Sequence, residues 1–144
     1  ENVPYIVGLA TAFELTQAEI LQRSKKSQML RDRIIDGVLA NVPRSRLTGH
    51  RTQRLPNHAS FSFEGVDGNQ LMINLDAAGF ACSSGSACKV GAHKPSGVLL
   101  AIGLPPNWAL GSLRVTLGKD SSPEDVDSFL IVLPEMVART RNQG

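Results

Sequence analysis

Cys88 is the side chain in this sequence whose surroundings best suit a chemical role. It follows a run of small residues, Ser83-Ser84-Gly85-Ser86-Ala87, and small residues let a backbone approach a ligand closely. Lys89, His93 and Lys94 lie within six positions of it, and nearby positive charge raises the thiolate fraction of a cysteine. Both a nucleophilic thiolate and a passive loop thiol fit these neighbours.

Cys82 has different surroundings. It follows Phe80 and Ala81 in a short apolar run, which predicts a strand and a buried thiol that packs as a small hydrophobic side chain. A single bridge between Cys82 and Cys88 would stabilise a domain of 144 residues poorly, because the loop that it closes is short. We therefore expect both thiols to be free.

Arg114 is the second candidate for a chemical role. The stretch Leu113-Arg114-Val115-Thr116-Leu117 alternates apolar and polar residues, which predicts a strand whose apolar side chains face the core. Arg114 and Thr116 then share the opposite face. A guanidinium there can bind a carboxylate through two parallel hydrogen bonds. A solvated arginine or a structural ion pair fits the same pattern.

Other kinds of site are not predicted. The two cysteines and the three histidines, His50, His58 and His93, lack the paired spacings that build a zinc site of about four ligands, so we expect no metal site. The sequence has no glycine-rich phosphate loop and no nucleophile elbow.

Charge and hydropathy exclude several classes of partner. The formal net charge is +2 with no basic block, which gives little reason to expect binding to nucleic acid or to an anionic membrane. No apolar run approaches the roughly 20 residues that span a bilayer, and no signal-peptide pattern opens the chain. A cytoplasmic location is the default expectation.

The candidate residues must be positioned by elements that the hydrophobic pattern predicts. Apolar residues keep helical spacing over the first 40 residues, as one long helix or two in tandem, which Pro43 ends. A loop then runs to about Pro56. Alternation predicts a strand over 59–63, a helix follows over 71–78 and ends at Gly79, and 80–82 is a second strand candidate.

The second half of the chain continues this alternation of elements. A short helix is predicted over 95–102, a turn at Pro105-Pro106, and then the Arg114 strand. Ser122-Pro123-Glu124-Asp125 is a capping pattern that starts a final helix. With 42% hydrophobic residues, the sequence predicts one soluble α+β domain: a small, mainly antiparallel sheet with helices on one face, preceded by a long N-terminal helix.

Several motifs, in order and spacing, resemble one family across nearly the whole chain. Ser83-Ser84-Gly85-Ser86-Ala87-Cys88 and the following Pro95-Ser96-Gly97-Val98-Leu99 resemble the active-site loop of the NifS/IscS-like cysteine desulfurases, which are of the class V aminotransferase type. Asn2-Val3-Pro4 with Ile6-Val7-Gly8 resembles the junction between the family's large and small domains, and Leu55-Pro56-Asn57 resembles its strand entry. Gly111-Ser112-Leu113-Arg114-Val115-Thr116-Leu117-Gly118 resembles its arginine strand.

The resemblance implies a mechanism that depends on pyridoxal phosphate. Sulfur of L-cysteine passes to a loop thiolate, which leaves a persulfide and alanine, and the persulfide sulfur then goes to an acceptor or scaffold protein for iron-sulfur cluster or thio-cofactor biosynthesis. Cys88 matches that thiol, and Arg114 matches the arginine that binds the substrate carboxylate. The resemblance also implies a homodimer in the full-length enzyme. Lys89-Val90-Gly91 departs from the small hydroxylated residues that many relatives have there.

The resemblance also implies that the cofactor is held outside this sequence. The family's Schiff-base lysine belongs to a preceding large domain, and its motif matches none of the lysines here, which are Lys25, Lys26, Lys89, Lys94 and Lys119. Residues 1–144 are then the C-terminal domain of fold-type I enzymes, with residues 1–16 as the interdomain connecting helix, an excised piece without the cofactor-binding domain. We expect this piece to be inactive alone. A sulfur-carrier or docking module of the same fold is the alternative.

Overall fold

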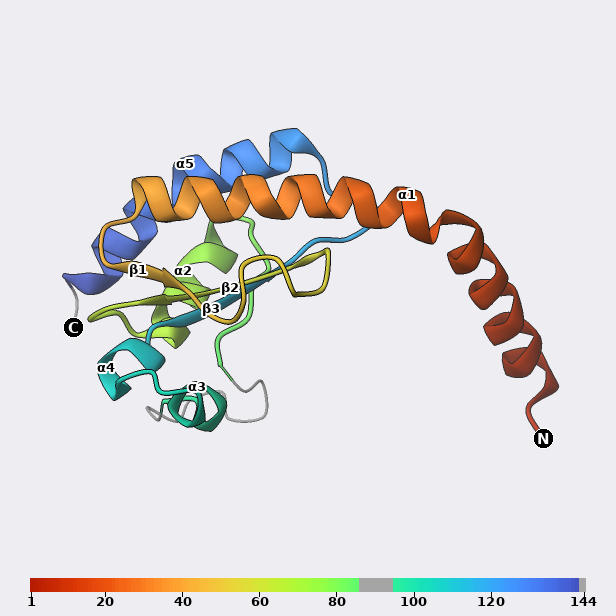
Figure 1. Cartoon of the computed structure of the whole chain (residues 1–144), viewed down its shortest axis with the longest axis horizontal. Coiled ribbons are helices and arrows are strands. Elements are labelled where there is room, and N and C mark those ends of the chain that lie inside the picture. The colour runs from red at the N-terminus through yellow and green to blue at the C-terminus, as the bar shows by residue number, and fades with distance from the viewer. Residues whose placement is uncertain (86–94, 143–144) are drawn as a thin grey trace.

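The structure is a computed structural model that describes residues 1–85 and 95–142. Its first element is a single helix of 39 residues, α1 (Val3–Asn41). Asn2 caps it by accepting a hydrogen bond from the backbone N–H of Tyr5, and Pro4 occupies the first turn, where a missing N–H costs nothing. The prediction of a long N-terminal helix is confirmed, as one helix. Its N-terminal part extends far beyond the sheet (Figure 1).

Three antiparallel strands form the sheet in the order β1 (Ser45–Leu47), β2 (His58–Phe63) and β3 (Ser112–Thr116). The last two strands were predicted, and β1 was not. The expected loop before Pro56 therefore contains a strand. Three residues are too few to show a period of two, and β1 is defined by its pairing with the second half of β2.

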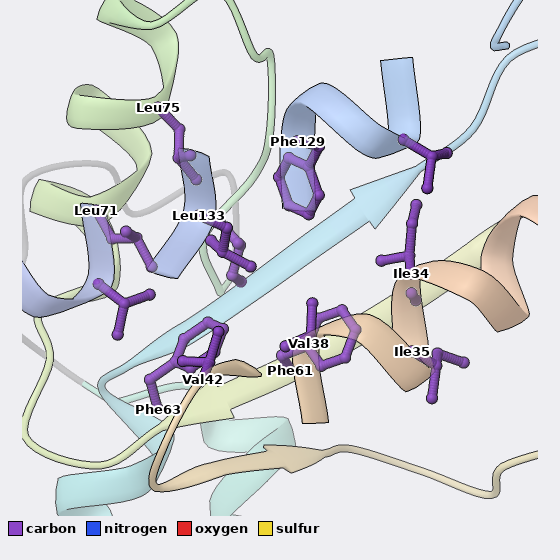
Figure 2. Packing of buried hydrophobic residues seen from close by; sticks show 14 of the residues in the cluster. Ile34, Ile35, Val38, Val42, Phe61, Phe63, Leu71, Leu75, Phe129 and Leu133 are labelled. Atoms are coloured by element: carbon purple, nitrogen blue, oxygen red, sulfur yellow. The ribbon is translucent and has the colours of Figure 1, made fainter. Parts of the chain in front are cut away.

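Three helices pack on one face of the sheet and enclose the core (Figure 2). These are α1, α2 (Gly68–Ala77) and α5 (Pro123–Arg141). Each contributes apolar side chains to the buried cluster that also contains Phe61 and Phe63 of β2. The core residues include Ile34, Ile35, Val38, Leu71, Leu75, Leu113, Phe129 and Leu133. The predicted α+β fold, with helices on one face of a small antiparallel sheet, is confirmed.

Two short helices lie on the opposite side of the sheet, at one end (Figure 1). They are α3 (Gly97–Ala101) and α4 (Pro106–Ala109), so the expected turn at Pro105-Pro106 is the start of a helix. The Trp108 ring of α4 lies 4.0 Å from the Arg46 guanidinium carbon, and the Trp108 carbonyl accepts a hydrogen bond from Ser62. This end of the polar face is therefore covered, while the rest stays open.

The predicted strand over 80–82 is wrong. Gly79, at a φ of 90°, ends α2 in a Schellman turn, in which the N–H of Phe80 donates to the carbonyl of Leu75. The Phe80 ring then packs edge-on against Phe129, with 5.5 Å between the ring centroids. The apolar run thus ends α2 and packs against α5, and an isolated bridge from Ser83 to Arg114 forms in place of a regular strand.

Candidate functional site

Arg114 lies on the polar face of the sheet, as its place in the alternating strand predicts. Its side chain is exposed, whereas Leu113 beside it is fully buried in the core. Cys88, with Lys89, His93 and Lys94, lies outside the described residues, so its predicted role stays a prediction. The two residues on either side of that segment, Gly85 and Pro95, are described.

Ser83 holds Arg114 from the side of β3 that faces away from β2. The N–H of Arg114 donates to the Ser83 carbonyl at 2.7 Å, and the N–H of Ser83 donates to the Arg114 carbonyl at 3.1 Å. One terminal nitrogen of the guanidinium also donates to the Ser83 hydroxyl oxygen at 3.1 Å. Three hydrogen bonds to one residue fix both the backbone and the direction of this side chain. The sequence motif predicts no such contact, because it arises from pairing across 31 positions.

Ser84 and Gly85, which precede Cys88 by four and three positions, are held as well. The Ser84 hydroxyl donates to Asn69 Oδ1 of α2 at 2.6 Å, and the N–H of Gly85 donates to the Ser112 hydroxyl at 3.1 Å. Gly85 has a φ of 43°, a left-handed conformation that costs glycine little. The segment that leads to Cys88 is therefore fastened to α2 and to the Arg114 strand.

An open pocket of about 310 Å³ lies on the polar face of the sheet. Its polar lining residues are His58 and Ser60 of β2, Ser112 and Arg114 of β3, and Ser96, and Gly85 lines it as well. Val98 and Leu99 of α3 form an apolar part of its wall. A guanidinium beside hydroxyl and imidazole groups gives a pocket suited to a small anion such as a carboxylate.

His58 is a pocket residue whose position the sequence did not indicate. It is half-buried, and burial lowers the pKa of its imidazole, with the charges of Arg54 and Arg114 adding to the effect. The imidazole is therefore neutral near pH 7. The signal that could have found it is the period of β2, since His58, Ser60 and Ser62 alternate with core residues and face the same side as Arg114.

Cys82 is a half-buried free thiol that packs against the core. Burial raises its pKa to about 11, so the thiol is protonated at neutral pH. This environment agrees with the prediction that Cys82 packs as a small hydrophobic side chain.

The described residues that line the pocket offer no group for covalent attachment of pyridoxal phosphate. No lysine is among the described residues that line it, and its donors suit the carboxylate of a bound small molecule. Over residues 1–85 and 95–142, no three His, Cys, Asp or Glu side chains gather as metal ligands would. Within the same residues, no helix has the length and hydropathy to span a membrane.

The chain belongs to the aminotransferase class-V family, whose sequence profile matches residues 1–129. Relatives of high sequence identity within that family include cysteine desulfurases. It is 46% identical over 144 residues to the cysteine desulfurase IscS of Methanosarcina thermophila, and 43% identical over 146 residues to IscS of Clostridium botulinum. Both matches cover 100% of this chain but 35% and 37% of the relatives, so the chain spans about a third of their length.

A solved structure agrees with this family membership. A NifS-like protein superposes with a TM-score of 0.81 at 29% sequence identity, over 96% of this chain and 34% of that protein. The resemblance to NifS/IscS-like cysteine desulfurases, read from the motifs around Cys88 and Arg114, is thus confirmed at the level of the family.

Proposed function

We propose that this chain is the sulfur-accepting portion of a pyridoxal-phosphate-dependent cysteine desulfurase, with Cys88 as acceptor and Arg114 as the carboxylate-binding residue. The observation that carries the proposal is the pocket. Gly85, three positions before Cys88, and Ser96, eight positions after it, both line the pocket that Arg114 lines. Three residues of chain reach at most about 11 Å, a span that makes Cys88 a candidate to reach this pocket.

Arg114 would bind and orient the substrate. Among the described residues, the guanidinium donates only to Ser83, and its other N–H groups could bind a carboxylate from the pocket. Fixing the carboxylate of L-cysteine at one end of the pocket limits where its sulfur can lie. Such positioning lets the Cys88 thiol react with the substrate thiol within one complex, without a chance encounter between free molecules.

Cys88 would act as the nucleophile. Its thiolate sulfur forms a new S–S bond with the substrate sulfur, and the Cβ–S bond of L-cysteine breaks. The electron pair of that bond stays with Cβ, which takes up a proton, so the products are alanine and a persulfide on Cys88. Pyridoxal phosphate, held by the rest of the protein, would supply the electron sink for this step.

The arrangement of the full protein is part of the proposal. Residues 1–22 are all exposed, including Leu9 at 72% and Phe13 at 62%, which is more apolar surface than an isolated helix end normally presents. We assign residues 1–16 as a helix that connects to a cofactor-binding domain. Homodimer formation, a cytoplasmic location and a sulfur-acceptor or scaffold protein for iron-sulfur or thio-cofactor biosynthesis complete the proposal by analogy with the family.

The test is made in the full-length protein that carries this chain. Cys88→Ser should abolish persulfide and alanine formation from L-cysteine. Arg114→Ala should raise KM for L-cysteine by roughly tenfold to a hundredfold, as expected for loss of a hydrogen-bonded charge pair. Arg33→Ala removes an exposed arginine that pairs with Asp127, and it serves as the control with an unchanged KM.

Two outcomes would overturn the proposal. One is an unchanged KM in Arg114→Ala, and the other is normal alanine formation in Cys88→Ser. The alternative, a sulfur-carrier or docking module, predicts that Cys88 accepts sulfur from a persulfide donor while no alanine forms from L-cysteine. Measuring alanine and Cys88 persulfide together separates the two functions.

A further inference from the structure

The register of β2 and β3 places a second hydrogen-bonding group beside the carboxylate-binding arginine. Arg114 is paired with Ser60, and His58 is paired with Thr116. Paired residues of antiparallel strands project to the same face, so His58 is the diagonal neighbour of Arg114 on the polar face. Diagonal neighbours are about 7–8 Å apart at the backbone, which long side chains can bridge with a small ligand between them. Both residues line the same pocket.

The charge around His58 decides which form of its imidazole enters the pocket. Among the described residues, the charged side chains that act on it are Arg54, from the loop before β2, and Arg114 of β3. Both are positive and both lower its pKa, after the larger effect of burial. A neutral imidazole still has one N–H to donate, and it adds no charge that would repel Arg114.

The geometry points to His58 as a second carboxylate-binding residue, which donates an N–H hydrogen bond to the same substrate carboxylate that Arg114 binds. This inference rests on the function proposed above. Arg114 is directed by Ser83 from one side of β3, and His58 approaches from the other side, on β2. A carboxylate between them has an acceptor oxygen for each residue.

Carboxylate binding and protonation of His58 should favour each other. A bound carboxylate neutralises the charge of Arg114, which is one cause of the lowered pKa, so His58 takes up a proton more readily in the complex. By linkage, the complex binds more protons than the free pocket, and carboxylate affinity rises as the pH falls. The rise occurs around and below about pH 6.5, the ordinary pKa of histidine, and it is absent above that range.

The experiment measures inhibition of the full-length enzyme by propionate, which has a carboxylate but neither a thiol nor an amine. Propionate is mostly ionised from about pH 5.5 to pH 8, and its partial protonation at pH 5.5 weakens inhibition, which opposes the expected effect. For the unchanged enzyme, the inhibition constant should fall roughly threefold or more between pH 7.5 and pH 5.5. His58→Ala should raise it roughly tenfold at pH 6, the weaker end of the effect for a hydrogen bond to a charged group.

Two further variants separate a carboxylate contact from a structural role. His58→Asn keeps a donor but cannot titrate, so it should restore most of the affinity at pH 7.5 and remove the fall at lower pH. His50→Asn changes an exposed histidine whose Nδ1 accepts hydrogen bonds from Thr52 and Gln53 within its own loop, and it should keep the pH dependence.

The outcomes also distinguish this inference from the function on which it rests. If Arg114→Ala weakens propionate binding while the His58 variants behave as the unchanged enzyme, the role of His58 is refuted and that of Arg114 stands. If Arg114→Ala has no effect on propionate or L-cysteine, the proposed function fails as well. A pH dependence that persists in His58→Asn also refutes the inference.

Discussion

The two thiols of this chain differ in the surroundings that control their reactivity. Cys82 packs against the core, and burial raises its pKa to about 11, so at pH 8 only about one molecule in a thousand carries the thiolate there. Cys88 follows a run of small residues and precedes Lys89, which favours an accessible thiolate. The packed thiol of Cys82 and the thiol that we propose as the nucleophile thus stand six positions apart.

Alkylation rates test this contrast at single residues. With iodoacetamide at pH 8, Cys88 should react at least about tenfold faster than Cys82, because only the thiolate is nucleophilic. Peptide mass spectrometry over a time course gives both rates. Cys82→Ala should leave the fast phase intact, and Cys88→Ala should remove it. Equal or reversed rates under native conditions would contradict the assignment of Cys88.

At the scale of elements, the site depends on a tight corner that leads into β3. The N–H of Phe63 donates to the Gly111 carbonyl at 2.9 Å, which joins the end of β2 to the residue before β3. The backbones are so close that a Cβ on Gly111 would lie 2.0 Å from the Phe63 carbonyl oxygen. Glycine at this position therefore sets the register that brings Arg114 opposite Ser60.

Replacing Gly111 should destabilise the tight corner between β2 and β3. Gly111→Ala should lower the free energy of unfolding by about 2 kcal/mol or more, because backbone must shift to relieve the overlap. Gly118→Ala is the matched control, since a Cβ there would have no atom within 4 Å. Urea unfolding followed by circular dichroism compares the two variants. A Gly111→Ala variant as stable as Gly118→Ala would refute the steric explanation.

At the scale of the whole molecule, the proposed function makes this chain one part of a divided active site. Arg114, which we propose binds the substrate carboxylate, lines the pocket, but no lysine is among its described lining residues. The first 22 residues of the chain expose their side chains, and the chain spans about a third of its relatives. The proposed cofactor-binding domain, packed near α1, would account for the exposed side chains of α1 and for the missing lysine in the described pocket lining.

The isolated chain should therefore bind no stoichiometric pyridoxal phosphate. After incubation with the cofactor and dialysis, it should show no visible absorbance band and should form no alanine from L-cysteine. The full-length protein treated in the same way should show both. A stoichiometric cofactor band in the isolated chain would refute the proposal that the lysine lies elsewhere.

Local pattern was enough to predict the features that depend on a residue's own neighbours. Alternation predicted β2, β3 and the outward face of Arg114, and the capping residues Ser122 and Asp125 predicted the start of α5, where both reciprocal hydrogen bonds form. Motif order indicated the family and singled out Cys88. These signals are local because side-chain burial repeats with the period of each element.

The tertiary structure alone decided which segments pair and which side chains meet. Residues 45–47 become β1 through pairing with β2. Residues 80–82 form no strand: Phe80 packs on Phe129, and Ser83 makes the bridge to Arg114. The same long-range contacts place Ser83 and His58 on either side of Arg114. Such contacts join positions tens of residues apart, and the hydrophobic period of one segment carries no information about its partner.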